Sequence, residues 1–96
     1  MEEKEGSKPE GTGAGEAPVT FAVLLSGLMM DALVALGDME HPVTKKKEPN
    51  LDHARFSIGM LELLQEKTKN NLTKGEAEML EGLLYDLRMR FVSKKG

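Results

Sequence analysis

Three residues have side chains that could do chemistry: His41, His53 and Asp31, which interrupts an apolar stretch. Histidines that share a site with carboxylates commonly bind zinc or transfer protons. Here neither histidine has a second histidine or a carboxylate at the spacing of a recognised zinc motif, and Asp52 beside His53 would point elsewhere on a helix. We therefore predict two surface histidines and expect no metal and no cofactor. A metal-ligand role for either histidine is the alternative.

Nucleophilic and phosphate-binding motifs are missing from the chain. The sequence has no cysteine, which excludes disulfides, thiolate zinc sites and cysteine nucleophiles. It has no nucleophile elbow and no HExxH helix, and GTGAG at residues 11–15 lacks the preceding strand and following helix of a phosphate loop. Asp31 could act as a buried carboxylate, but we expect it to face a helix end, an Arg or water. We predict no catalytic residue and therefore no enzyme.

Two basic clusters could bind phosphate groups. The residues are Lys45, Lys46, Lys47, Arg88, Arg90, Lys94 and Lys95. Nucleic-acid binding would need both clusters on one face, with aromatic side chains nearby for single strands. Phe91 is the aromatic residue nearby, and we expect it in the core; cations at the end of a helix also suit the negative end of the helix dipole. RNA or ribosome association through these residues is the alternative function, which we do not favour.

The charge of the chain is concentrated at its N-terminus. The net charge is −3, and residues 1–16 account for it with five glutamates against two lysines. Because the remaining residues are neutral overall, they have no general attraction to nucleic acid or to an anionic membrane. Residues 1–18 also lack apolar periodicity, so we predict a disordered acidic tail there and a single helical domain over residues 19–96.

The segment TFAVLLSGLMMDALVALG, residues 20–37, is apolar on almost every side. It predicts a helix over about 20–36, with Thr20 as N-cap and Gly37 just past the end. The run is too short for a membrane span and contains Asp31, so we predict no span. A helix that is apolar all round must be covered all round.

Two further helices are predicted, over about 51–69 and 74–92. Asn50 is a good N-cap for the first, and Thr73 with Glu76 forms a capping box for the second. The NNLT turn between them is short, so the two helices should form an antiparallel hairpin. The predicted fold is therefore all-α, with three helices per chain.

Each helix of the hairpin carries one apolar face. The first face comprises Leu51, Ala54, Ile58, Leu61 and Leu64, widened by Phe56, Met60 and Leu63. The second comprises Ala77, Leu80, Leu84, Leu87 and Phe91, with Met79 and Leu83 beside it. Gly27, Gly59 and Gly82 fall inside the three helices, where we expect them to let helix axes cross closely. A ligand approach or a hinge is the alternative.

One hairpin covers only about half of the helix at 20–36. We expect about five of its large side chains to remain in water, with roughly 10 kcal/mol of gross driving force for burial. An exposed patch of that size is unusual on a soluble monomer, and a symmetric dimer is the simplest closed solution. We therefore predict a dimeric helical bundle. The predicted interface residues are Leu24, Leu25, Leu28, Met29, Met30 and Leu33.

The whole-helix pattern matches a known family. The strongest match is LELLQEKTKNNLTKGEAEMLEGLLYDLRMRFV, residues 61–92, and a weaker one is FAVLLSGLMMDALVALGDMEHP, residues 21–42. With NLDHARFSIGMLELL between them, these segments resemble DUF1844, a family of small uncharacterised bacterial proteins. The resemblance implies a small helical bacterial protein. It implies no activity, cofactor or site residue, because the family has none assigned.

The predicted function rests on the apolar helix surfaces, because the sequence shows no catalytic motif. We expect a small non-enzymatic protein–protein interaction module, an adaptor or regulator, that acts as a homodimer in the cytoplasm. A further protein partner is expected but not identified by the sequence.

Overall fold

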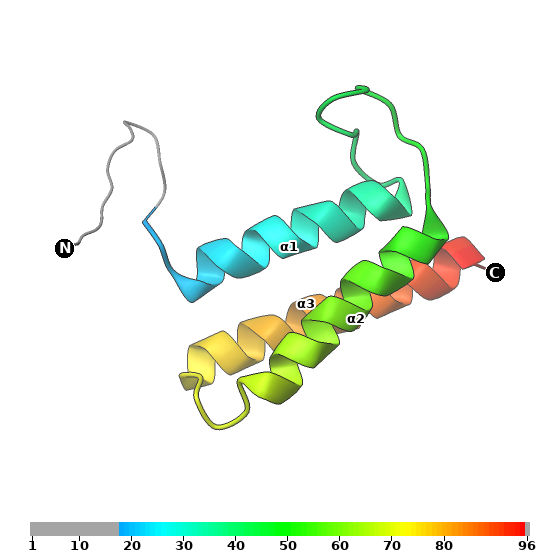
Figure 1. The fold of residues 1–96 in the computed structure, drawn as a ribbon. Coiled ribbons are helices and arrows are strands. Elements are labelled where there is room, and N and C mark those ends of the chain that lie inside the picture. The colour runs from blue at the N-terminus through cyan, green and yellow to red at the C-terminus, as the bar shows by residue number, and fades with distance from the viewer. Residues whose placement is uncertain (1–17, 96) are drawn as a thin grey trace.

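Three α-helices make up most of residues 18–95, which are the residues that the computed structural model describes. They are α1 (Phe21–Leu36), α2 (Leu51–Lys67) and α3 (Lys74–Lys95). The helices α1 and α3 run in the same direction and α2 runs against both (Figure 1). No strand occurs within this range, so the predicted all-α fold with an α2–α3 hairpin is confirmed. The predicted acidic tail, apart from Pro18, lies outside the described residues.

Local side chains cap the helices as predicted. Thr20 Oγ1 and Asn50 Oδ1 each accept a hydrogen bond of 3.1 Å from the backbone N–H three residues later. Thr73 and Glu76 form the capping box, with hydrogen bonds of 3.1 and 2.9 Å. Asn70 adopts the left-handed conformation in the turn after α2, at φ 72°. Because these bonds satisfy N–H groups that a helix start leaves unpaired, the sequence fixes the starts of the helices locally.

The end of α1 depends on a glycine that also contacts a distant proline. Gly37 has φ 82°, and its N–H donates to Val34 O while Asp38 N–H donates to Leu33 O. This pair of bonds is the Schellman pattern, which favours glycine because an L side chain is strained there. A Cβ on Gly37 would lie 2.7 Å from Pro49 Cγ. The end of α1 therefore requires glycine for two reasons: the positive φ and the close contact with Pro49.

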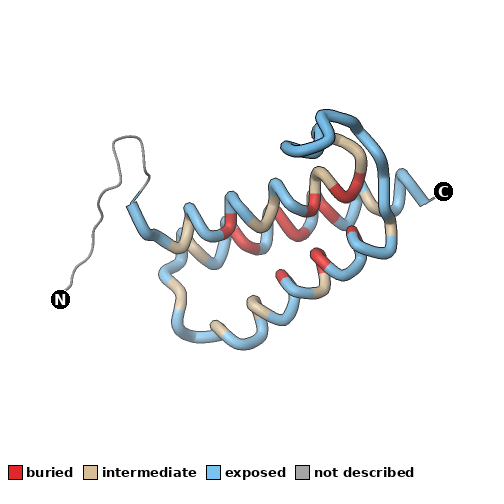
Figure 2. Tube along the Cα trace, turned by 45° about the horizontal axis from the view of Figure 1, so that its top comes forward, coloured by how far each residue is buried: buried red, intermediate tan, exposed pale blue. Residues whose placement is uncertain are grey.

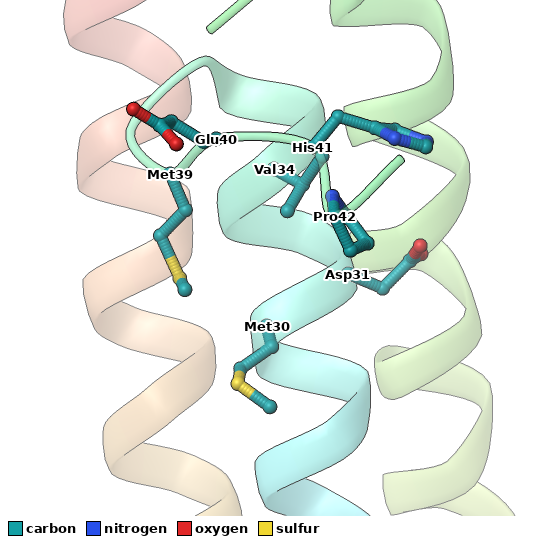
Figure 3. A pocket seen from close by; sticks show the side chains of 7 residues that line it. All are labelled: Met30, Asp31, Val34, Met39, Glu40, His41 and Pro42. Atoms are coloured by element: carbon teal, nitrogen blue, oxygen red, sulfur yellow. The ribbon is translucent and has the colours of Figure 1, made fainter. Parts of the chain in front are cut away.

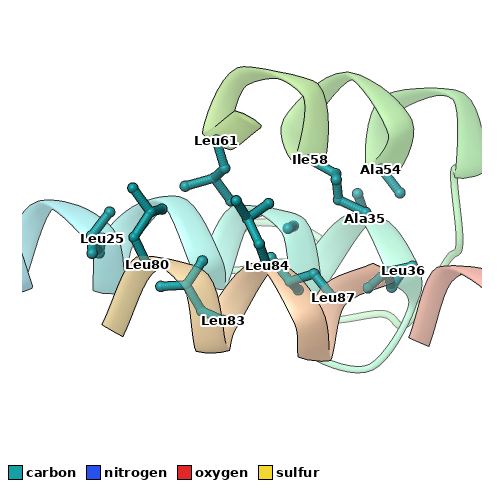
Figure 4. Packing of buried hydrophobic residues seen from close by; sticks show 11 residues of the cluster. Leu25, Ala35, Leu36, Ala54, Ile58, Leu61, Leu80, Leu83, Leu84 and Leu87 are labelled. Carbon is teal, nitrogen blue, oxygen red and sulfur yellow. The ribbon is translucent and has the colours of Figure 1, made fainter. Parts of the chain in front are cut away.

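The core lies where the three helices meet (Figure 4). Each helix buries one face and exposes the opposite one (Figure 2). The buried hydrophobic residues are Leu25, Ala32, Ala35, Leu36, Ala54, Ile58, Leu61, Leu80, Leu83, Leu84 and Leu87. On α2, the residues expected to widen the apolar face point outward instead. Phe56, Met60 and Leu63 are 61, 46 and 47% exposed. The core face of α2 is therefore narrower than its sequence suggests.

An ion-pair cluster fastens the end of α1 to α3. Asp38 lies 3.0 Å from Arg90 Nη1 and 2.8 Å from Lys94 Nζ, and Arg90 Nε also contacts Asp86 at 2.9 Å. The hydrogen bond from Lys94 is the main reason that the pKa of Asp38 lies below its usual value; burial opposes this effect and Arg90 adds to it.

Candidate interaction surface

The side of α1 that faces away from α2 and α3 is apolar, and three of the four residues on it are exposed. Val23, Gly27, Met30 and Val34 occupy it at spacings of four, three and four residues, which keeps them on one side of a helix. Val23 is 41% exposed, Met30 is 50% exposed and Gly27 is exposed, whereas Val34 is half-buried beside the loop that follows α1. Leu25, on the opposite side, is fully buried. We call these four residues the α1 outer face.

The six predicted interface residues divide between the core and the surface. Leu24 and Met30 are exposed, and Leu28, Met29 and Leu33 are half-buried against the core. Leu25 is fully buried within its own chain, so it does not belong to an interface. The rest of the chain thus covers more of α1 than expected: three of its large side chains, Val23, Leu24 and Met30, are exposed, not about five. Val23 and Gly27 belong to the exposed face instead.

A hollow of about 300 Å³ extends the α1 outer face at its C-terminal end. It lies between α1 and the α1–α2 loop (Figure 3). The lining residues are Met30, Asp31, Val34, Met39, Glu40, His41 and Pro42. The carboxylate of Asp31 is turned toward α2, so methionine, valine and proline side chains form most of the wall. We call this feature the α1 hollow; its composition suits an apolar side chain.

The glycines inside the helices do not serve packing within the chain. A Cβ added to Gly27, Gly59 or Gly82 would meet no atom within 4 Å. Within the chain, these three residues therefore do not let helix axes cross closely, contrary to the expectation. Because a mid-helix glycine lowers helix stability, an exposed glycine with no neighbour needs another explanation.

Asp31 brings together two side chains that are distant in sequence. Its Oδ2 accepts a 2.8 Å hydrogen bond from Ser57 Oγ and lies 3.3 Å from His53 Nε2. The His53 ring also stacks on Phe56, with centroids 5.9 Å apart. Asp31 is half-exposed, as expected, and it faces His53 in the first turn of α2. Ser57 is the buried polar residue of α2, and this bond satisfies its hydroxyl.

The order of contacts in this cluster differs from that of a catalytic triad. In a triad the histidine accepts the serine proton and the aspartate orients the histidine. Here Ser57 donates to the carboxylate, and His53 contacts the same oxygen of Asp31. The arrangement therefore supports cross-linking of α1 to α2 rather than activation of a nucleophile.

The described residues also lack a cluster suited to a metal ion. Within residues 18–95, no group of three or more His, Cys, Asp or Glu side chains could hold one. His41 Nδ1 accepts from the backbone N–H groups of Val43 and Thr44 at 3.0 and 3.4 Å. This side chain therefore shapes the loop that forms one wall of the α1 hollow.

The two basic clusters lie toward the same end of the bundle, where the α1–α2 loop approaches the C-terminal end of α3 (Figure 1). Carboxylates already neutralise much of the second cluster. Arg88 Nη2 lies 2.8 Å from Glu62, while Arg90 and Lys94 contact Asp38. The lysines at 45–47 are exposed in the loop. Phe91 is half-buried against the core, where Arg55 stacks over its ring.

The chain matches the family described as "Domain of unknown function (DUF1844)" over residues 18–93. It belongs to the DUF1844 family. The match spans all three helices of this DUF1844 chain and confirms the resemblance seen in its sequence. No curated protein and no solved structure matches the chain. In the described part of this DUF1844 member, no helix is both long and apolar enough to cross a membrane, as predicted.

Proposed function

We propose that this DUF1844 chain is a non-enzymatic protein–protein interaction module that acts as a homo-oligomer in the cytoplasm. The observation that carries the proposal is the uncovered α1 outer face. It is contiguous with the α1 hollow, and Asp31 is the one charged residue in the sixteen residues of α1.

Burial energetics support association through this face. Complete burial of an aliphatic or methionine side chain is worth roughly 1.5 to 3 kcal/mol. Val23 and Met30 are 41 and 50% exposed, so a partner would gain part of that value at each of these positions. A contiguous apolar patch indicates a contact surface more strongly than scattered exposed residues do, because single exposed hydrophobic residues are normal on soluble proteins.

The contacts of the ionisable groups support a structural role for them. Asp31 joins α1 to α2, Asp38 joins the end of α1 to α3, and Glu62 joins α2 to α3 through Arg88. Each contact joins two of the three helices. A rigid scaffold of this kind suits a protein that presents a surface.

Light scattering after size exclusion tests the proposal. We expect the full chain to have the mass of a dimer at about 100 μM. Met30→Glu places a charge on the α1 outer face and should yield a monomer with an unchanged helical spectrum. Met89→Glu is the matched control, since Met89 is 54% exposed on α3. A wild-type chain that is still monomeric at about 100 μM, far above typical dissociation constants, would contradict self-association.

RNA or ribosome association is a second candidate. The exposed lysines at 45–47 favour it, because they belong to the α1–α2 loop, which lies toward the end of the bundle where α3 ends (Figure 1). The carboxylates paired with Arg88, Arg90 and Lys94 count against it, because they already neutralise these cations. Retention on immobilised RNA at low salt, lost on combining Lys45→Glu, Lys46→Glu and Lys47→Glu, would establish it. Retention unaffected by those changes, or no retention, would remove it.

A further inference from the structure

We propose that a second copy of this chain docks on the α1 outer face with the two α1 helices antiparallel. Met30 of one chain then lies over Gly27 of the partner subunit, and Val23 lies against Val34 of the partner subunit. This inference rests on the proposed function and specifies the geometry of the homo-oligomer. Four observations carry it, and each concerns residues of α1 or the loop after it.

The first observation is the symmetry of the face. Val23 precedes Gly27 by four residues, and Val34 follows Met30 by four residues. The spacing therefore reads the same in both directions. An isologous dimer requires a surface that is complementary to itself under a two-fold axis. Antiparallel pairing about the midpoint between Gly27 and Met30 brings valine to valine and glycine to methionine, twice each.

The second observation is the fit of a small residue to a large one. Met30 is half-exposed, and a Cβ at Gly27 would meet no atom of its own chain within 4 Å. A glycine on a helix surface lets a neighbouring helix or side chain approach closely. The antiparallel arrangement fills the space over each Gly27 with a methionine, which is flexible enough to adapt to it. The antiparallel pairing would explain why position 27 is a glycine, which no contact within the subunit explains.

The third observation is that the two ends of α1 complement each other. At the N-terminal end, Val19 is 99% exposed and Val23 follows one turn later. At the C-terminal end lies the α1 hollow of about 300 Å³, walled by Met30, Val34 and the loop after α1 (Figure 3). Antiparallel docking places the valines of one chain over the hollow of the other, and the symmetry repeats this contact.

The fourth observation is electrostatic. Asp31 is the one charge on α1, and its carboxylate already accepts from Ser57 and lies beside His53 on the α2 side. The two apolar faces can therefore meet without burying an unpaired charge, which would otherwise oppose association.

Other occupants fit less well. Parallel pairing would set Met30 against Met30 and Gly27 against Gly27 and would leave both hollows empty. The preceding residues of the chain, 1–17, contain five glutamates and no large apolar side chain besides Met1. Such a segment cannot supply the apolar surface that the face needs. A helix of sixteen residues is about 24 Å long, so the contact is small and we expect a micromolar dissociation constant.

Disulfide trapping tests the register directly, because the chain has no native cysteine. Val23→Cys and Val34→Cys are made as separate full-length proteins and then oxidised alone and as a mixture. We expect covalent dimers only in the mixture, since the proposed pairing sets position 23 opposite position 34. Met89→Cys on α3 is the control and should not form dimers. Circular dichroism checks that each variant is folded, and light scattering records the mass before oxidation.

The outcomes separate the geometry from the function. Covalent dimers of Val23→Cys alone or Val34→Cys alone would overturn the antiparallel register, whereas self-association would stand. A non-covalent dimer that traps only through Met89→Cys, or through none of the variants, would overturn the α1 face as the contact. A wild-type monomer in the light-scattering measurement would instead overturn the proposed homo-oligomer itself.

A swap of the two central residues gives a second test. Gly27→Met fills the space that Met30 of the partner subunit would occupy, so we expect the dissociation constant to rise at least about tenfold. The double variant Gly27→Met, Met30→Gly restores a methionine opposite a glycine and should recover most of the affinity. Equal affinity for the wild type and Gly27→Met, or no recovery in the double variant, would contradict the proposed pairing.

Discussion

The outer faces of α1 and α3 both expose large apolar side chains, yet they differ in what surrounds them. On α3, Tyr85, Met89 and Val92 are 66, 54 and 63% exposed. Nine of the 22 residues of α3 are charged, and Glu78, Glu81 and Arg88 lie on or beside this face. On α1, Asp31 is the one charged residue of sixteen, and the exposed residues adjoin an apolar hollow.

This difference shows that exposure alone does not identify an interface. The exposed residues of α3 are more accessible than those of α1, but charged neighbours keep their surroundings solvated. On α1 the apolar residues form a face without an intervening charge, and water around it has few polar groups to contact. This contrast is the reason that we propose α1, and not α3, as the contact between copies, and the following substitutions test it.

The largest effect is expected at two adjacent residues of α1 that differ strongly in burial. Leu25 is fully buried and Leu24 is 48% exposed. Leu25→Ala should lower the free energy of unfolding by about 2–5 kcal/mol, because it leaves a cavity in the core. Leu24→Ala should cost less than about 1 kcal/mol. Urea denaturation monitored by circular dichroism measures both; equal losses would mean that α1 is not packed as described.

The next effect concerns the end of α1. Gly37→Ala should lower the free energy of unfolding by about 1–3 kcal/mol, because it places a side chain at positive φ and against Pro49. Gly75→Ala is the control at the start of α3, where a Cβ meets no atom within 4 Å. We expect no loss there. An unchanged melting temperature for Gly37→Ala would contradict the close contact with the loop.

Substitutions of two glycines test whether the contact between copies lies on α1 or on α3. Gly27→Ala and Gly82→Ala should each raise the free energy of unfolding of the monomer by about 0.5–1 kcal/mol, because alanine favours a helix and neither position is crowded. Only Gly27→Ala should also weaken the dimer, by several-fold in sedimentation velocity. The opposite pattern, with a weaker dimer for Gly82→Ala, would move the contact to α3.

The smallest effect is a pH dependence at the junction of α1 and α3. Because the folded chain holds the pKa of Asp38 below its usual value, its contribution is present at neutral pH and disappears as the pH falls below about 4. Asp38→Asn should cost about 1 kcal/mol at pH 7 and flatten the acid limb of a melting-temperature profile. Asp52→Asn, at a side chain 97% exposed, is the control and should cost less stability at pH 7 than Asp38→Asn. Identical acid limbs for wild type and Asp38→Asn would refute the role of this cluster.

Several features of the fold were predictable from short segments of sequence. Thr20, Asn50 and the Thr73–Glu76 pair each act within one turn of a helix, so their capping bonds follow from the local sequence. Gly37 was predictable for the same reason, since it follows an apolar run. The family match over residues 18–93 likewise reflects the pattern of whole helices.

The surface was predictable only in part. Leu24 and Met30 are exposed as expected, but Leu25 lies in the core and Val23 replaces it on the outer face. In a helix that is apolar all round, composition gives no sign of which side meets the hairpin. The contact of Asp31 with Ser57 and His53 was missed because it joins residues more than twenty positions apart. Spacing within one helix carries no signal for such a contact.

By itself, the sequence determined that this chain forms three helices and where each helix starts. It also determined that α1 is apolar on almost every side, with Asp31 as its one charged residue. These properties follow from backbone capping and side-chain periodicity, which act over a few residues. Only the tertiary structure decided which side of α1 remains open, where the α1 hollow lies, and which cations are neutralised by carboxylates. Those properties depend on the rotation and register of packed helices, which are set by contacts between residues far apart in the chain.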